Sequence, residues 1–367
     1  MKKHVLIATG LAVLSTSAFA TKARMTSLGQ NATYGSQYLQ DTRNVFRNAS
    51  EVNAMKNYIV TDWKTATGEA EGGFFREAGS FSYGVYMGSE INAFNTERTN
   101  ANNTLGETTL TSDFQAHDNA LDVFVAGDAG VEWGARVHYA NGKNEQAIAG
   151  VTQKHSALGV GLGMGMGDIK AYFNMTLNDK SEGAGASGDK FEAKDMLVGA
   201  SYGWMGYVFS AEYAANGYEL TPANVVKGEK KNTELSIGVG KTKEISATSR
   251  MNWDVYYNSS EAKTKNVAGA AETKVKDTTL PVTIGFETDA TSWLVLRGAI
   301  TQKVLFNENK DNAGKKKTNA NTTAVTAGGT LNFGKLKVDG ALEGASDGTG
   351  SLNANKLLTT VAVHYWF

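Results

Sequence analysis

The side chains that most often perform chemistry are few in this sequence. Beyond residue 20 the chain has four histidines, His117, His138, His155 and His364, and the chain has no cysteine. A hydrolase would need a serine or an acidic pair beside a histidine, and no sequence motif shows such a group. We therefore expect no enzyme activity, no cofactor and no metal site.

One glycine-rich stretch has the spacing of a phosphate-binding loop. Residues 159–167 contain G-x-G-x-G, which binds phosphate when it follows a strand and opens a helix. Here the run lies inside an alternating apolar stretch and no helical pattern follows it, so we expect a strand instead. No Asp-rich loop has the ligand spacing of a calcium site.

Charged side chains recur at every second position of several apolar stretches. In the clearest one, residues 131–139, apolar side chains alternate with Glu132, Arg136 and His138. Successive side chains of a strand point to opposite faces, so the charged face meets solvent in a soluble sandwich or a water-filled lumen in a barrel. Ten residues are predicted to line such a lumen: Asp122, Glu132, Arg136, Lys170, Arg250, Asp254, Glu287, Arg297, Lys337 and Asp339.

Charges of both signs on opposing walls allow two interpretations. They could set up a transverse field across an open channel, or they could pair and close a narrow lumen. Net charge is no further guide, because 36 Lys and Arg nearly balance 37 Asp and Glu, and binding to nucleic acid is not expected. Lysine clusters in the polar stretches would face lipopolysaccharide or an anionic solute, although ordinary solvated charge explains them as well: Lys227, Lys230, Lys231, Lys263, Lys265 and Lys315 to Lys317.

The spacing of the alternating stretches predicts the topology. From Ser80 onward, short turns and long polar connections alternate strictly along the chain. Short turns on one side and long loops on the other are typical of outer-membrane barrels. The sequence therefore predicts an all-β, transmembrane, antiparallel up-and-down barrel of 14 strands over residues 80–367.

Both ends of the chain fit this interpretation. Residues 1–20 read as a signal peptide with cleavage between Ala20 and Thr21. Residues 21–79 are predicted to form a partly helical segment in the periplasm or the lumen, with Asp41 and Ser50 as helix caps; residues 57–63 look β-like but isolated. The last strand alternates apolar residues up to a terminal aromatic: Val361, Val363, Tyr365 and Phe367.

Three stretches carry a resemblance to a known family. The runs SLGQNATYGSQYL, DTRNVFRNA and VAVHYWF resemble the major outer-membrane protein of Bdellovibrio-type predatory bacteria, which is porin-like. More remotely, the chain is similar to the fourteen-stranded fatty-acid channels, in which an N-terminal hatch closes the lumen. The hatch of those channels has an Asn-Pro-Ala turn, where this chain reads Asn48-Ala49-Ser50.

The resemblance implies an outer-membrane channel for passive diffusion of small hydrophilic solutes. The alternatives are a structural barrel with a closed lumen and a hatch-gated transporter of hydrophobic substrates. The implied partners are outer-membrane lipid, lipopolysaccharide, the barrel-assembly machinery, which reads the C-terminal strand, and small solutes. Homo-oligomer formation is left open.

Overall fold

The computed structural model describes residues 21–64, 70–89, 94–100, 114–117, 119–145, 152–183, 188–222, 226–267, 271–311, 314–317, 323–346 and 360–367. The expected signal peptide lies outside these residues. The short helical elements are α2 (Lys22–Ser27), η1 (Thr42–Phe46), η2 (Ala49–Ala54) and α3 (Asn95–Thr99). No helix in this described part is long and apolar enough to cross a membrane.

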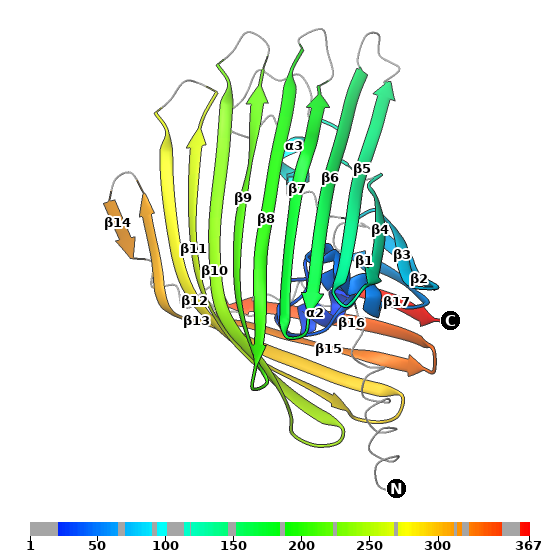
Figure 1. Ribbon diagram of the computed structural model, residues 1–367. Coiled ribbons are helices and arrows are strands. Elements are labelled where there is room, and N and C mark those ends of the chain that lie inside the picture. Colours follow the sequence, from blue (N-terminus) through cyan, green and yellow to red (C-terminus); the bar gives the residue numbers. More distant parts are fainter. Residues whose placement is uncertain are drawn as a thin grey trace, which may run out of the picture.

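Strands account for most of the described chain (Figure 1). They are β1 (Tyr58–Lys64), β2 (Ala70–Ala78), β3 (Phe81–Met87), β4 (Leu121–Asp128), β5 (Glu132–Glu145), β6 (Thr152–Met166), β7 (Ile169–Glu182), β8 (Lys190–Trp204), β9 (Tyr207–Thr221), β10 (Gly228–Glu244), β11 (Ser249–Lys265), β12 (Thr273–Asp289), β13 (Leu294–Asp311), β14 (Gly314–Lys317), β15 (Thr323–Phe333), β16 (Leu336–Ser346) and β17 (Thr360–Trp366).

The strands close into an antiparallel barrel. Each strand pairs with its neighbour in the chain, and β17 returns to pair with β1, from Trp366 opposite Tyr58 to Thr360 opposite Lys64. Among the described residues, the short β14 pairs with β13, and β13 pairs onward with β15. Among the described residues the wall therefore has 16 strands, not the 14 expected from the sequence.

The two extra strands are β1 and β2, so the wall begins at Tyr58 instead of at residue 80. The sequence pattern missed β2 because two of its residues are glycines. A Cβ atom on Gly72 would lie 2.7 Å from the carbonyl oxygen of Val60, and one on Gly73 would lie 2.5 Å from that of Val85. These positions tolerate no side chain, and the missing side chains erase the alternation by which a strand is recognised.

The connections alternate in length as expected. Two residues join β6 to β7, β8 to β9 and β15 to β16, whereas residues 88–120 join β3 to β4. Met205 and Gly206, between β8 and β9, both have positive φ (51° and 76°), as the right-handed twist of a two-residue hairpin requires. The short turns gather at one end of the barrel, the lower end in Figure 1.

The polarity of the barrel is inverted relative to a soluble domain. On β5, Val137 faces outward and its side chain is 47% exposed, whereas the adjacent Arg136 faces inward and is 5% exposed. The same division recurs around the wall: many large apolar side chains are exposed, and many charged ones are buried. An apolar outer face around a polar interior is the arrangement of a barrel that lies in lipid.

Residues 21–57, which we call the hatch, lie inside the barrel at its short-turn end (Figure 1). Phe46, Val52 and Met55 of the hatch pack in one apolar cluster with Phe75 and Phe124 of the wall. Asp41 caps η1 as expected, by accepting the N–H of Arg43. The cap of η2 is Asn48, which accepts the N–H of Ser50, so the expectation that Ser50 itself is the cap was wrong.

A second segment enters the barrel nearer its other end. Residues 94–100, which include α3, and residues 114–117 belong to the long β3–β4 connection, and we call them together the inner loop. Phe94 and Phe114 of the inner loop are buried in an apolar cluster with Phe191, Tyr218 and Leu220 of the wall. The described interior is thus occupied at two levels.

Candidate functional site

Three arginines fasten the hatch to different parts of the wall. The Nε atom of Arg24 lies 2.9 Å from an oxygen of Glu287 on β12, and Arg43 pairs with Glu71 on β2. The side chains of these two ion pairs are almost wholly buried. The third arginine, Arg47, pairs with Glu212 on β9. Buried charges need such partners, because an unpaired one would cost several kcal/mol.

Four of the ten residues predicted to line the lumen gather around the Arg24 anchor. Glu287 accepts hydrogen bonds from Arg24 and Arg297, and its Oε1 lies 2.5 Å from Nη2 of Arg250. Asp339 lies 3.5 Å from Arg297 and accepts a hydrogen bond of 2.9 Å from the Thr21 hydroxyl at the start of the hatch. These four face inward but hold the hatch in place, which is the pairing that the sequence left as an alternative.

The other six occupy separate places. Asp122 and Arg136 lie together beside His138. Lys170 reaches Glu51 of the hatch at 2.6 Å, and Glu132 is exposed nearby. Asp254 accepts hydrogen bonds from Gln30 and Tyr38 of the hatch, and Lys337 lies 5.0 Å from the ring of Trp366. That any of the ten lines a conducting pore stays a prediction.

Two cavities of similar size lie between the hatch and one side of the wall. The lower cavity, of about 290 Å³, reaches the short turn after β6 and is bounded by β7, β8 and β9. The upper cavity, also of about 290 Å³, is bounded by β9 to β13. Three hatch residues, Ser36, Gln37 and Arg47, line both cavities. The two spaces are therefore neighbours along one side of the hatch.

A cluster of four side chains, which we call the gate, lies where the two cavities meet. Three of them donate hydrogen bonds to Oε2 of the fourth, Glu212 on β9: Nε of Arg47 at 2.9 Å, the hydroxyl of Tyr172 at 2.6 Å and Nε2 of Gln37 at 3.1 Å. The amide of Asn174 donates a 2.8 Å hydrogen bond to the carbonyl oxygen of Arg47 and holds its backbone. A carboxylate that accepts three hydrogen bonds makes this contact specific in geometry as well as strong.

The gate was mostly missed by sequence reasoning. Glu212 lies on a face that the alternation of β9 marks as inward, but the alternation does not reveal its partners. Tyr172 gave a usable signal, because it is an aromatic residue on the polar side of β7. Arg47 and Gln37 lie in the hatch, where no period indicates a direction.

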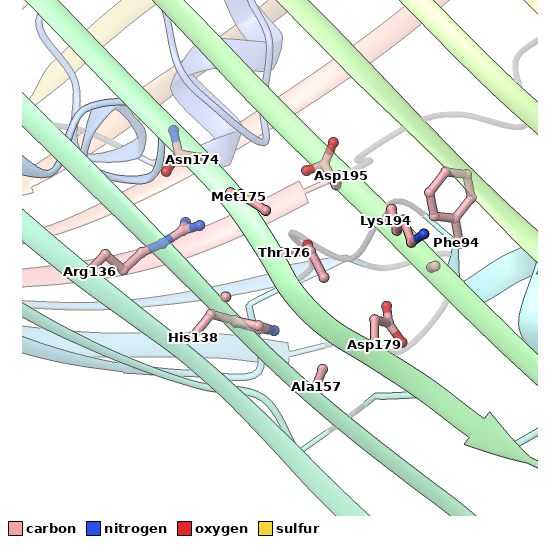
Figure 2. Close-up of a pocket in the computed structure, with 12 residues that line it drawn as sticks. Phe94, Arg136, His138, Ala157, Asn174, Met175, Thr176, Asp179, Lys194 and Asp195 are labelled. Carbon is pink, nitrogen blue, oxygen red and sulfur yellow. The ribbon is translucent and has the colours of Figure 1, made fainter.

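A third space, the side cavity, lies against the inner side of β5 to β8, and Phe94 of the inner loop also lines it (Figure 2). It is small, about 30 Å³, and its lining includes Arg136, His138, Asn174, Asp179 and Asp195. Beside it the ladder between β7 and β8 is interrupted from Met175–Met196 to Lys180–Glu192. Between these pairs β7 has four residues, 176–179, and β8 has three, 193–195, and this bulge lies at the level of the cavity.

The inner loop is fastened by one buried ion pair. Nη2 of Arg98 lies 2.6 Å from Asp179 on β7, and Nε2 of His117 lies 3.5 Å from the same carboxylate oxygen. The ring of His117 packs 4.6 Å from that of His155. Burial, with Arg98 and His155 nearby, lowers the pKa of His117 to about 2. His117 is therefore neutral while the inner loop is in place.

A scan against protein-family models found no match, and neither did a search of the curated proteins. The resemblance to the Bdellovibrio-type protein is not confirmed and stays a prediction.

Among solved structures, the chain is similar to a Pseudomonas aeruginosa FadL homologue, with a TM-score of 0.45 and 9% identity over 94% of this chain and 98% of that one. It is also similar to the Ralstonia pickettii toluene transporter TbuX, with a TM-score of 0.36 and 12% identity over 95% and 99% of the two chains. It is similar as well to the Pseudomonas putida toluene transporter TodX, with a TM-score of 0.38 and 11% identity over 94% of this chain and 97% of that one. At TM-scores this low, these likenesses carry no argument about the function of this chain.

Proposed function

We propose that this chain is a non-catalytic outer-membrane channel for small polar solutes, closed in this conformation by its hatch. The path runs between the hatch and the β7–β13 side of the wall, through the upper cavity, the gate and the lower cavity. The single observation that carries the proposal is that two polar cavities share three hatch residues and meet at one side-chain cluster.

The proposed location in a membrane is supported by the outer face of the barrel wall and by the length of its strands. The barrel is closed, its outer face is apolar and its charged side chains are buried inside. Strands β5 to β13 have 14 to 18 residues, more than the roughly 9–11 residues that a tilted strand needs to cross a bilayer. In water such a surface would associate or aggregate, whereas lipid covers it at no cost.

The open porin lumen implied by the resemblance is not what the structure has, because the hatch fills the barrel at its short-turn end. Unassisted diffusion through a permanently open pore is therefore not proposed. The linings of both cavities are mainly polar or charged: Glu212, Glu234 and Asp254 project from the upper wall, with Arg47 on the hatch. A polar solute is favoured over a hydrophobic one, since these groups would lose their hydration to an apolar ligand.

The gate provides the test. Arg47→Ala removes the side chain that bridges hatch and wall, so purified protein in planar bilayers should show larger or more frequent current steps than the unmodified chain. Glu212→Ala should act in the same direction, because it removes the acceptor for all three donors.

The matched control is Lys56→Ala. Lys56 also forms a hatch–wall ion pair, 2.5 Å from Glu77, but this pair is exposed and lines neither cavity. Its removal should leave the current unchanged. If the two gate variants stay as silent as the unmodified chain in the same bilayers, the chain is a structural barrel and the channel proposal fails.

A further inference from the structure

The side cavity contains a buried arginine whose hydrogen-bonding capacity is largely unused. Within the described part of the chain, Arg136 donates one hydrogen bond, from Nη1 to the carbonyl oxygen of Phe46 at 3.4 Å. Its side chain is almost completely buried, and its Nε atom has no hydrogen-bond partner there. A guanidinium has five N–H donors, and buried donors are normally satisfied.

The carboxylate nearest to Arg136 does not fill this need. Oδ1 of Asp122 lies 3.7 Å from Nε of Arg136, which is beyond hydrogen-bond length. The same carboxylate is already held by Nδ1 of His138 at 3.0 Å and by the hydroxyl of Ser89. Asp122 therefore balances the charge of the arginine from a distance and leaves its donors available to the cavity.

We propose that the side cavity binds the carboxylate of a small zwitterionic solute of the α-amino acid class, through Arg136. A guanidinium presents donors in a planar fork that matches a carboxylate. Asp195 lies across the cavity from Arg136 in Figure 2, and it forms no ion pair with it among the described residues. A carboxylate at that side repels a second negative charge and attracts an ammonium group.

The size of the cavity restricts the ligand. A water molecule needs about 10–15 Å³ of such space, so about 30 Å³ holds the carboxylate end of a solute and leaves little room for a side chain. Gly159 lines this space, and at the nearby Gly161 a Cβ atom would lie 2.4 Å from Oδ1 of Asn174 and 3.4 Å from Nε of Arg136, two side chains that also line the space. The glycine-rich run of β6 thus gives the floor of a binding site instead of a phosphate loop.

This inference rests on the proposed function in one respect: a solute that permeates the barrel would reach the side cavity. Binding of the solute is measured without any measurement of current. Isothermal titration calorimetry of the full chain in detergent, with glycine as the probe, should show saturable binding. Acetate and methylammonium, which each carry one of the two charges, should bind at least about tenfold more weakly, because each loses one charge-assisted contact.

Three variants make the result decisive. Arg136→Gln should weaken glycine binding by at least about tenfold, and Arg136→Lys should weaken it too, because lysine keeps the charge but loses the fork. Arg76→Gln, which removes an exposed arginine of β2, should leave binding unchanged. Circular dichroism and heat modifiability confirm that each variant is a folded barrel.

The proposal is overturned if glycine does not bind, if acetate binds as tightly as glycine, or if folded Arg136→Gln binds as well as the unmodified chain. None of these results concerns the gate, so the current through Arg47→Ala still decides whether the chain is a channel. Conversely, a silent Arg47→Ala variant would leave a measured glycine site standing.

Discussion

Glu287 is a wall residue to which the hatch is attached by a buried ion pair. Three guanidinium groups meet at its buried carboxylate: Arg24 from the hatch, Arg250 from β11 and Arg297 from β13. Substitution Glu287→Gln keeps nearly the same shape and removes only the charge. The three arginines then share one neutral amide, which accepts through a single oxygen and presents N–H donors where the other oxygen was.

The expected cost follows from this geometry. A hydrogen bond to a charged group contributes about 1.5–3 kcal/mol, and removal of one partner from a buried ion pair costs about 3–5 kcal/mol. Asp41 and Asp339 remain near Arg24 and Arg297 and soften the loss. We therefore expect Glu287→Gln to lower the free energy of unfolding by about 3–5 kcal/mol and not by the sum of three separate contacts.

Urea unfolding of the barrel in lipid vesicles, followed by tryptophan fluorescence, measures this change. The chain offers a matched control in Glu261, which also meets three cations, Lys263, Lys274 and Lys276, at 3.3, 2.7 and 2.9 Å, but on a more exposed part of β11. Glu261→Gln should leave the unfolding midpoint where it is. Equal effects of the two substitutions would refute the assignment of Glu287 as a buried anchor.

Two further predictions concern the outer face and the inner loop. Val137→Arg places a charge on the lipid side of β5 and should lower the unfolding free energy in vesicles by about 2–4 kcal/mol. Val137→Leu should leave that free energy unchanged. If Val137→Arg also leaves it unchanged, this face of β5 does not meet lipid. Because closure lowers the pKa of His117 from about 6.5 to about 2, the closed inner loop is favoured above about pH 6.5 and loses stability as the pH falls below it. Between about pH 7.5 and about pH 5.5 the ratio of released to packed inner loop should rise about tenfold, measured as the fluorescence of a dye attached through Thr96→Cys on the exposed side of α3; His117→Gln should abolish the response, and a pH-independent ratio would contradict it.

The wall was largely predictable because a strand carries its own signal. Alternation on β5 placed Val137 outside and Arg136 inside, and short turns such as that at Gly334 marked the hairpins. The prediction failed at β1 and β2, where Gly72 and Gly73 lack side chains because neighbouring backbones approach closely. The alternation of residue types therefore shows which side chains face outward wherever the wall has room for side chains. Strands such as β2, in which glycines replace them, are missed.

The site could not be predicted in the same way, because its contacts are distant in the sequence. Arg24 and Glu287 are 263 positions apart, and Arg47 and Glu212 are 165 apart. Alternation shows that Glu287 and Glu212 face inward but not which hatch residue each one meets. The interior charges were therefore equally consistent with an open channel and with a paired, closed lumen until the hatch was placed.

The hatch is held unequally around the barrel, and this inequality indicates where it would yield. Its pairs with Glu287 and Glu71 are almost fully buried, whereas the carboxylate of Glu212 is 20% exposed and the ammonium-bearing side chain of Lys170 is 44% exposed. Solvent screens an ion pair in proportion to its exposure, so the pairs on the β7–β9 side hold the hatch less firmly. The two large cavities lie against this same weakly held part. The proposed solute path on that side would require the contacts of Arg47 and Gln37 with Glu212 to open, while α2 stays anchored at Glu287 and the barrel keeps its stability.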